Sequence, residues 1–450
     1  MVYLNRPIKH KFLTKIILTY ALIGILNTSA YAFDLLDAWH AAKQYNANLL
    51  AADYQRKAGQ EKFNQGVAQL LPQVSASADY SSNETTKPKT SKQFETHGWT
   101  VKAVQPLFDV GKYAAFKQGQ TNAQLAQVQF NQTEQTFMVE VAQAYFELLL
   151  VHDTLEATRS AKNAYAKQLQ RAKAAFNAGA ATIVDTHEAQ ANYDAAVAKE
   201  ITAQSDLDIK ANQLQMLTGL NPAQIQKVDG QKVLQGTTEY PLEKLQDLAI
   251  DNNPEVKAKE HQVTLVRQEL LARRGDRFPK IQLTSSYNNR VNNTPSSFWN
   301  PTTHLSQGYA VGVEASIPLF TGGAIHSQVK ESKYKRSQAL EELEAAKRLI
   351  KEKVRQAYLG ITNGEAEVKA MERLLSSRKT KLDSTRKGQE FGVRTSLDLL
   401  DAESEYYETI RSLAEVRYRY LLSQLQLAQA VGVLNEGILA KTNSAIREVE

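Results

Sequence analysis

The chain has 450 residues, a formal net charge of +6 and no cysteine. The missing cysteine excludes disulfide bonds, thiolate metal sites, a cysteine nucleophile and a lipidated N-terminal cysteine. Lys and Arg alternate with Glu along apparent helices instead of gathering with aromatic residues, which argues against a nucleic-acid partner. Mean hydropathy is −0.43, and no segment beyond the N-terminal region holds 18 consecutive apolar residues. Any part of the chain that crosses a membrane is therefore expected to do so as strands.

The first 32 residues have the pattern of a secretory signal peptide. Four basic residues, at positions 6, 9, 11 and 15, precede an apolar run over 16–26, and Ala30-Tyr31-Ala32 supplies a small-x-small cleavage signature. The run is about half the roughly 20 residues that a membrane-spanning helix needs, so a permanent N-terminal anchor is the weaker alternative. Removing residues 1–32 lowers the formal charge from +6 to +2, and the mature chain is expected to begin near Phe33.

The chain contains an internal repeat, which decides its architecture. An offset of 213 residues superposes Gly179, Thr182 and Asp185 on Gly392, Thr395 and Asp398. Nearer the N-terminus the offset is 207 and superposes Asn46 and Pro72 on Asn253 and Pro279. We expect a first repeat over 33–220, an inter-repeat segment over 221–241, a second repeat over 242–435 and a C-terminal tail over 436–450.

Each repeat has the same order of elements. A helical stretch, over 49–71 or 254–278, is stopped by a proline, because proline disfavours the helical region for its predecessor. A strand with period-two alternation follows, marked by Val74 and Tyr80 in the first repeat. Long polar connections are expected over 81–98 and 288–308, before returning strands that end at Pro106 and Pro318.

A long helical pattern comes next in both repeats. The first, from Gly111 to Phe176, has about 66 residues and spans roughly 100 Å. Apolar residues at three-four spacing give each long helix a narrow seam of coiled-coil type. Short breaks at 177–182 and 392–395 then reverse the chain into a second helix, which runs to 217 or 430. Each repeat is therefore expected to carry a long antiparallel helical hairpin.

Four strands cannot close a barrel, and open sheet edges are not tolerated in lipid. If the strands face lipid, several copies of the chain must assemble, and three copies would give twelve strands around a water-filled lumen. Trp99 and Tyr309, near the starts of their strands, suit an interfacial aromatic girdle or an ordinary strand position equally well.

Two segments carry a resemblance to a known family. Gly392-Val393-Arg394-Thr395-Ser396-Leu397-Asp398-Leu399-Leu400-Asp401-Ala402 resembles the helix-turn motif of the TolC family of outer-membrane efflux and secretion channels, and residues 430–436 are similar too. The resemblance covers about 400 residues. It implies a mainly α fold with a membrane β-barrel: a homotrimer with a twelve-stranded barrel and a twelve-helix periplasmic tunnel.

The resemblance also implies a location and partners. The channel would lie in the outer membrane of a Gram-negative bacterium, among outer-membrane lipid, and extend through the periplasm. It would dock a periplasmic adaptor, also called a membrane fusion protein, and an inner-membrane transporter of ABC, RND or MFS type. No cofactor, metal or catalytic residue is expected. Drug efflux, type I protein secretion and cation export all stay open as the transport task.

The functional residues are expected at the hairpin tips. By resemblance, Gly179, Thr182, Gly392 and Thr395 form adaptor-docking turns, Asp398 and Asp401 form a channel constriction, and Asp185 and Arg394 form gate links. The alternative is that the glycines and threonines only provide turn chemistry and that the aspartates only stabilise helix starts. Where the best-known members carry a gate tyrosine, this chain has Gln389, which leaves its gate bonding pattern open.

Two other classes of protein compete with a channel. An enzyme has little support, because His187-Glu188 lacks the second histidine of the zinc protease pattern and no glycine-rich phosphate loop is present. A periplasmic coiled-coil protein, structural or docking and without a pore, would explain the helices and the signal peptide. It would not explain the paired strands bounded by prolines.

Overall fold

The computed structural model of the chain describes residues 32–87, 90–226, 240–295 and 301–446. The predicted signal peptide lies outside these residues except for its last position, and so does most of the predicted inter-repeat segment. Among the helices of the described ranges, none combines the length and the apolar character needed to cross a membrane.

The two halves of the chain contain the same series of elements. The first half consists of α2 (Leu35–Tyr45), α3 (Ala47–Ala68), β1 (Gln73–Lys87), β2 (Thr90–Phe108), α4 (Val110–Asn177), α5 (Ile183–Thr218) and the short 3₁₀ helix η1 (Pro222–Gln224). The second half consists of α6 (Leu242–Asn252), α7 (Pro254–Gly275), β3 (Lys280–Pro295), β4 (Pro301–Ser316), α8 (Ala324–Glu390), α9 (Ser396–Val431) and α10 (Glu436–Ile446). Helix α10 lies in the segment that we expected as a tail.

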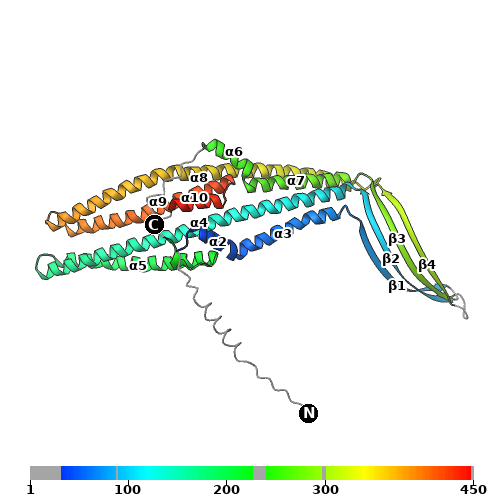
Figure 1. Ribbon diagram of the computed structural model, residues 1–450, viewed down its shortest axis with the longest axis horizontal. Coiled ribbons are helices and arrows are strands. Elements are labelled where there is room, and N and C mark those ends of the chain that lie inside the picture. Colours follow the sequence, from blue (N-terminus) through cyan, green and yellow to red (C-terminus); the bar gives the residue numbers. More distant parts are fainter. Residues whose placement is uncertain (1–31, 88–89, 227–239, 296–300, 447–450) are drawn as a thin grey trace, which may run out of the picture.

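The molecule is long, with a sheet at one end and two helical tips at the other (Figure 1). Helix α4, with 68 residues, and helix α8, with 67, run the whole length of the helical part. The shorter helices share this length: α3 and α5 pack along α4, while α7 and α9 pack along α8. Helix α4 also contacts α7 and α9, so the two halves form one helical layer.

An asparagine lies between α2 and α3 and another between α6 and α7, and each caps the helix that follows it. Asn46 follows α2 and caps the start of α3: its side-chain oxygen accepts hydrogen bonds from the backbone N–H groups of Asn48 and Leu49. Asn253 does the same between α6 and α7, where its oxygen accepts from Glu255 N and its amide nitrogen donates to Ala430 O at 2.8 Å. These contacts satisfy backbone groups that a helix start leaves free.

The four strands form one antiparallel sheet in the order β1-β2-β3-β4. They are longer than predicted: the connections expected over 81–98 and 288–308 are largely strand, since β1 reaches Lys87 and β3 reaches Pro295. That expectation was wrong because it placed the end of each strand where the alternating apolar residues stop. The strands are extended by backbone pairing, which polar, threonine-rich sequence supports as well.

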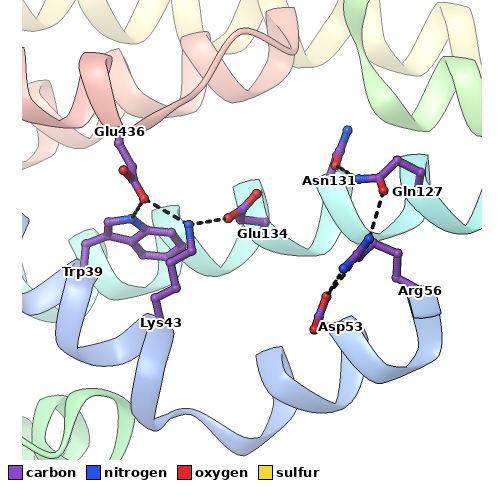
Figure 2. A network of polar contacts seen from close by, with 8 residues as sticks. All are labelled: Trp39, Lys43, Asp53, Arg56, Gln127, Asn131, Glu134 and Glu436. Carbon is purple, nitrogen blue, oxygen red and sulfur yellow. Dashed lines mark hydrogen bonds and ion pairs between the residues drawn. The ribbon is translucent and has the colours of Figure 1, made fainter.

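The largest buried cluster lies at mid-length, where α2 and α10 meet the long helices. Trp39 of α2 is fully buried, and its indole N–H donates to Glu436 Oε1 of α10 at 3.1 Å. The same oxygen lies 3.0 Å from Lys43 Nζ, which also lies 3.0 Å from Glu134 of α4 (Figure 2). The hydrogen bond from Trp39 and the ion pair with Lys43 lower the pKa of Glu436. Trp39 and Lys43 thus connect α2 with both α4 and α10.

We expect Trp39→Ala to lower the free energy of unfolding by about 3 to 5 kcal/mol, because it leaves a cavity in this cluster. Trp39→Phe should cost less, about 2 kcal/mol, since it keeps one aromatic ring, removes one hydrogen bond and leaves a smaller cavity. Denaturant titration in detergent, followed by circular dichroism, measures both changes. Equal losses for the two variants would show that packing of the ring does not stabilise this junction.

Candidate functional site

The first hairpin tip is closed by glycine and threonine. Helix α4 ends at a left-handed Gly179, with φ of 73°, and Ala180 N donates to Ala175 O at 2.8 Å. Thr182 then starts α5: its hydroxyl accepts from Asp185 N, and its backbone N–H donates to Asp185 Oδ2 at 2.8 Å. This reciprocal pair is a capping box, so Thr182 and Asp185 both have a structural role.

The second tip repeats this design 213 residues later. Gly392 is left-handed, with φ of 74°, and Thr395 forms a capping box with Asp398. The side chain of Arg394 lies over Gly388, where an added Cβ would come within 2.7 Å of Arg394 Cγ. Gln389 Nε2 donates to Ser396 Oγ at 3.1 Å, so this side chain braces the turn within its own hairpin.

Asp398 has a cap role and also keeps its charge. Its Oδ2 accepts from the backbone N–H and the hydroxyl of Thr395, each at 2.9 Å. These hydrogen bonds, the backbone one first, lower the pKa of Asp398 below its ordinary value of 3.8. From the sequence, Asp398 has two alternative roles, a charged constriction or a stabilised helix start. They are compatible, because a carboxylate that caps a helix remains negative near neutral pH.

Asp401 lies one turn further along α9 and is exposed. It lines a depression of about 230 Å³ between α4, α5 and α9, which also contains the side chains of Lys199, Tyr165 and Arg411. Within one chain, the described contacts of Asp185 are with Thr182, and no ion pair joins it to Arg394. A link between these two residues therefore requires a neighbouring chain or a movement of the tips.

A buried polar cluster near the tips was not found from the sequence. Glu403 of α9 is only 5% exposed, and one of its oxygens lies 3.4 Å from Arg386 Nη2 of α8. Burial raises the pKa of Glu403, and Arg386 and Arg171 partly oppose this rise. Beside it, Gln168 of α4 donates to Ser396 O at 3.0 Å and so connects the two hairpins. No motif marks these residues; only the apolar spacing of Leu399, Ala402 and Tyr406 around Glu403 hints at its burial.

One face of the sheet carries apolar side chains that stay open to solvent in the single chain. Cross-strand pairing places Ala76, Val101, Tyr287 and Tyr309 in one row across all four strands. On β4 the exposed fractions are 83% for Tyr309, 67% for Val311 and 66% for Val313. Leu319 and Phe320, between β4 and α8, are 92% and 89% exposed. A patch of this kind marks an interaction surface.

The described residues offer no arrangement suited to catalysis at a metal. Within those ranges, no group of three or more histidine, aspartate or glutamate side chains is placed to hold a metal ion. The chemistry gathered at the tips is that of helix caps and charged side chains.

Curated relatives match almost the whole chain. It is 29% identical over 427 residues to the outer membrane protein TolC of Vibrio cholerae, which covers 95% of this chain and 97% of that protein. It is 29% identical over 437 residues to the proteases secretion protein PrtF of Dickeya chrysanthemi, covering 94% and 93%. It is 28% identical over 443 residues to TolC of Escherichia coli, covering 97% and 89%.

Solved structures share the fold. The outer membrane protein VceC of Vibrio cholerae superposes with a TM-score of 0.73 at 17% identity, covering 88% of this chain and 96% of that one. The CmeC outer membrane channel of Campylobacter jejuni superposes with a TM-score of 0.75 at 15% identity, covering 91% and 88%. The sequence profile of the outer membrane efflux protein family matches residues 38–220 and 245–433. The predicted kinship is thereby confirmed, and the chain belongs to the outer membrane efflux protein family.

Proposed function

We propose that this outer-membrane channel works as a homotrimer, the exit duct of a tripartite efflux pump or a type I secretion system. The observation that carries the proposal is the four-stranded sheet with two open edges and an exposed apolar face, joined to a helical layer about 100 Å long. A lone chain would leave both edges and that face uncovered.

The sheet supplies the membrane part of the duct. The alternating apolar run over 309–317 has nine residues, the length that a tilted strand needs to cross a bilayer of about 30 Å. Lipid cannot satisfy the backbone groups of an open edge, so the strands must close into a barrel. Three copies give twelve strands, enough for a water-filled lumen, whereas two copies give a nearly filled one.

The helical layer supplies the periplasmic tunnel. At every height each chain contributes four helices, α3, α4, α7 and α8 near the sheet and α5, α4, α9 and α8 near the tips. Three copies would therefore make a twelve-helix tube. The tips, with Gly179, Thr182, Gly392 and Thr395 at their turns, would meet the periplasmic adaptor and, beyond it, the inner-membrane transporter of ABC, RND or MFS type.

The relatives named for protease secretion and those named for efflux support both kinds of transport task. The alternative is a coiled-coil docking protein without a pore. The exposed apolar face of the sheet argues against it, because such a protein would leave that face uncovered. Extraction settles the choice: a channel requires detergent and migrates as a heat-modifiable trimer, whereas a periplasmic coiled coil is released without detergent.

The carboxylates at the tips are expected to make the pore cation-selective. In planar bilayers, Asp398→Asn with Asp401→Asn should lower the cation-to-anion permeability ratio by roughly fivefold for each charge removed, the effect of about 1 kcal/mol per charge at 4 Å in water. Asparagine at 398 can still accept from Thr395 N and so keeps the cap. Asp383→Asn, on α8 of the same hairpin, is the matched control and should leave the permeability ratio unchanged. Unaltered selectivity in the double variant would falsify the constriction.

The pH dependence separates the two carboxylates. In the Asp401→Asn variant, cation preference should persist at pH 4, because hydrogen bonds from Thr395 hold the pKa of Asp398 below 3.8. With its pKa below 3.8, Asp398 is more than half ionised at pH 4, and it loses its charge only as the pH falls through the lowered pKa. Loss of the preference between pH 6 and pH 4 would contradict this assignment.

The gate links should hold the tips closed. Arg394→Ala and Asp185→Asn are each expected to raise single-channel conductance, because each removes one partner of a breakable link between hairpins. Asp185→Asn is preferable to alanine, since the amide oxygen keeps the capping box with Thr182. Thr182→Ala is the control: it weakens the cap by about 1 kcal/mol and leaves the charge. Conductance that rises equally in the control would assign the effect to cap damage.

A further inference from the structure

A basic depression lies where the helices meet the sheet. It has a volume of about 600 Å³ and opens between the end of α7 and the first turns of α8. Its wall includes four cationic and two aromatic side chains: Arg274, Arg277, Lys330, Lys333, Phe278 and Tyr334. Strand β3 begins at Lys280, two residues after Phe278, so the depression adjoins the strands directly.

Within the part of the chain that the structure describes, the four cations have no carboxylate partner. No lining residue is acidic, and among the described residues no ion pair is formed by Arg274, Arg277, Lys330 or Lys333. The nearby carboxylates are already engaged by other cations: Asp276 by Lys280 and Arg273, and Glu331 and Glu269 by Lys335. Four uncompensated positive charges around one cavity favour an anionic ligand.

The aromatic side chains give the same depression an apolar rim. Phe278 is 53% exposed and Tyr334 is 66% exposed. The exposed Leu319 and Phe320 lie in the connection that leads from β4 into α8. A ligand suited to this place combines an anionic group with an apolar body.

The depression opens on the same side of α8 as helix α6. Lys330 and Lys351 are 21 residues apart, three heptads, and therefore share one face of a coiled-coil helix. Helix α6 packs on α8 there, and its Gln246 donates to Lys351 O at 3.1 Å. A face covered by a helix cannot line the lumen, so in the trimer proposed above this side faces outward.

The corresponding junction of the first repeat lacks most of these basic residues. At the offsets of the internal repeat, Arg274 and Arg277 correspond to Val67 and Leu70, and Lys333 corresponds to Gln120. Only Lys330 keeps a cation, at Lys117, which lies over the rings of Tyr113 and Phe116. The fold of this junction therefore does not require the basic residues, which points to a separate role for them.

We propose that this depression binds the phosphate of an anionic phospholipid in the leaflet next to the helical part. The arginine guanidinium groups and the lysine ammonium groups bind the phosphate, while Phe278 and Tyr334 contact the glycerol and the first acyl carbons. The inference rests on the membrane position of the sheet proposed above. Bound lipid would fix the depth of the channel at the side where α7 and α8 leave the membrane.

Native mass spectrometry of the detergent-extracted full chain tests the site, with phosphatidylglycerol and phosphatidylcholine at equal concentration. The wild type should retain phosphatidylglycerol preferentially. Lys330→Gln with Lys333→Gln should weaken this retention by about fivefold per charge, the fold-change that about 1 kcal/mol per basic residue gives. Lys112→Gln with Lys117→Gln also removes two positive charges per chain, but at the first-repeat junction, and should leave retention unchanged.

Three outcomes would overturn the proposal: equal retention of the two lipids, equal loss in the two double variants, or full displacement of phosphatidylglycerol by millimolar inorganic phosphate. The last outcome would assign the site to a soluble anion. All four substituted lysines lie away from the hairpin tips, and heat-modifiable trimer migration checks that each variant is assembled. A preparation that conducts ions without selecting phosphatidylglycerol rejects the lipid site alone, whereas one without any conductance challenges the channel.

Discussion

The packing of α4 against helices from both halves of the chain is the interaction on which the structure depends. A helix of 68 residues cannot bury its apolar stripe against itself, and its own hairpin partner covers only part of its length. Helices α7 and α9 of the second half cover another side, with Tyr418 stacked on Phe146. The two repeats therefore form one layer, and the sheet and the tips are held at its opposite ends.

Much of this architecture could be predicted from the sequence, because it follows from residues with local effects. Gly179 and Gly392 end helices, Thr182 and Thr395 start them, and a proline stands directly before β1 and β3. Pro106 does not end β2, which continues to Phe108 with a register shift. The strand lengths could not be predicted, since backbone pairing continues beyond the last apolar side chain. The cluster of Glu403, Arg386 and Gln168 was also missed, because its members lie on three helices and no spacing in the sequence connects them.

At the candidate tip residues, the same aspartate side chain caps a helix and carries a charge. A helix start concentrates N–H donors, and these donors hold the pKa of Asp185 and Asp398 low. A carboxylate placed there is both structurally anchored and reliably charged. The sequence predicts the cap and the charge together; in the proposed trimer, a partner of that charge across the lumen would come from another copy of the chain.

The two hairpin tips share their helix caps and differ in the side chains that brace them. Both tips keep the same glycine, threonine and aspartate, since a change there would open a helix end. Their bracing differs: Gln389 bonds Ser396 in the second tip, whereas the corresponding position in the first tip is Phe176. A threefold assembly would thus alternate two kinds of hairpin around its end. Movement of the tips then need not be uniform, because the hydrogen bond from Gln389 to Ser396 braces the second tip and has no counterpart at Phe176 of the first.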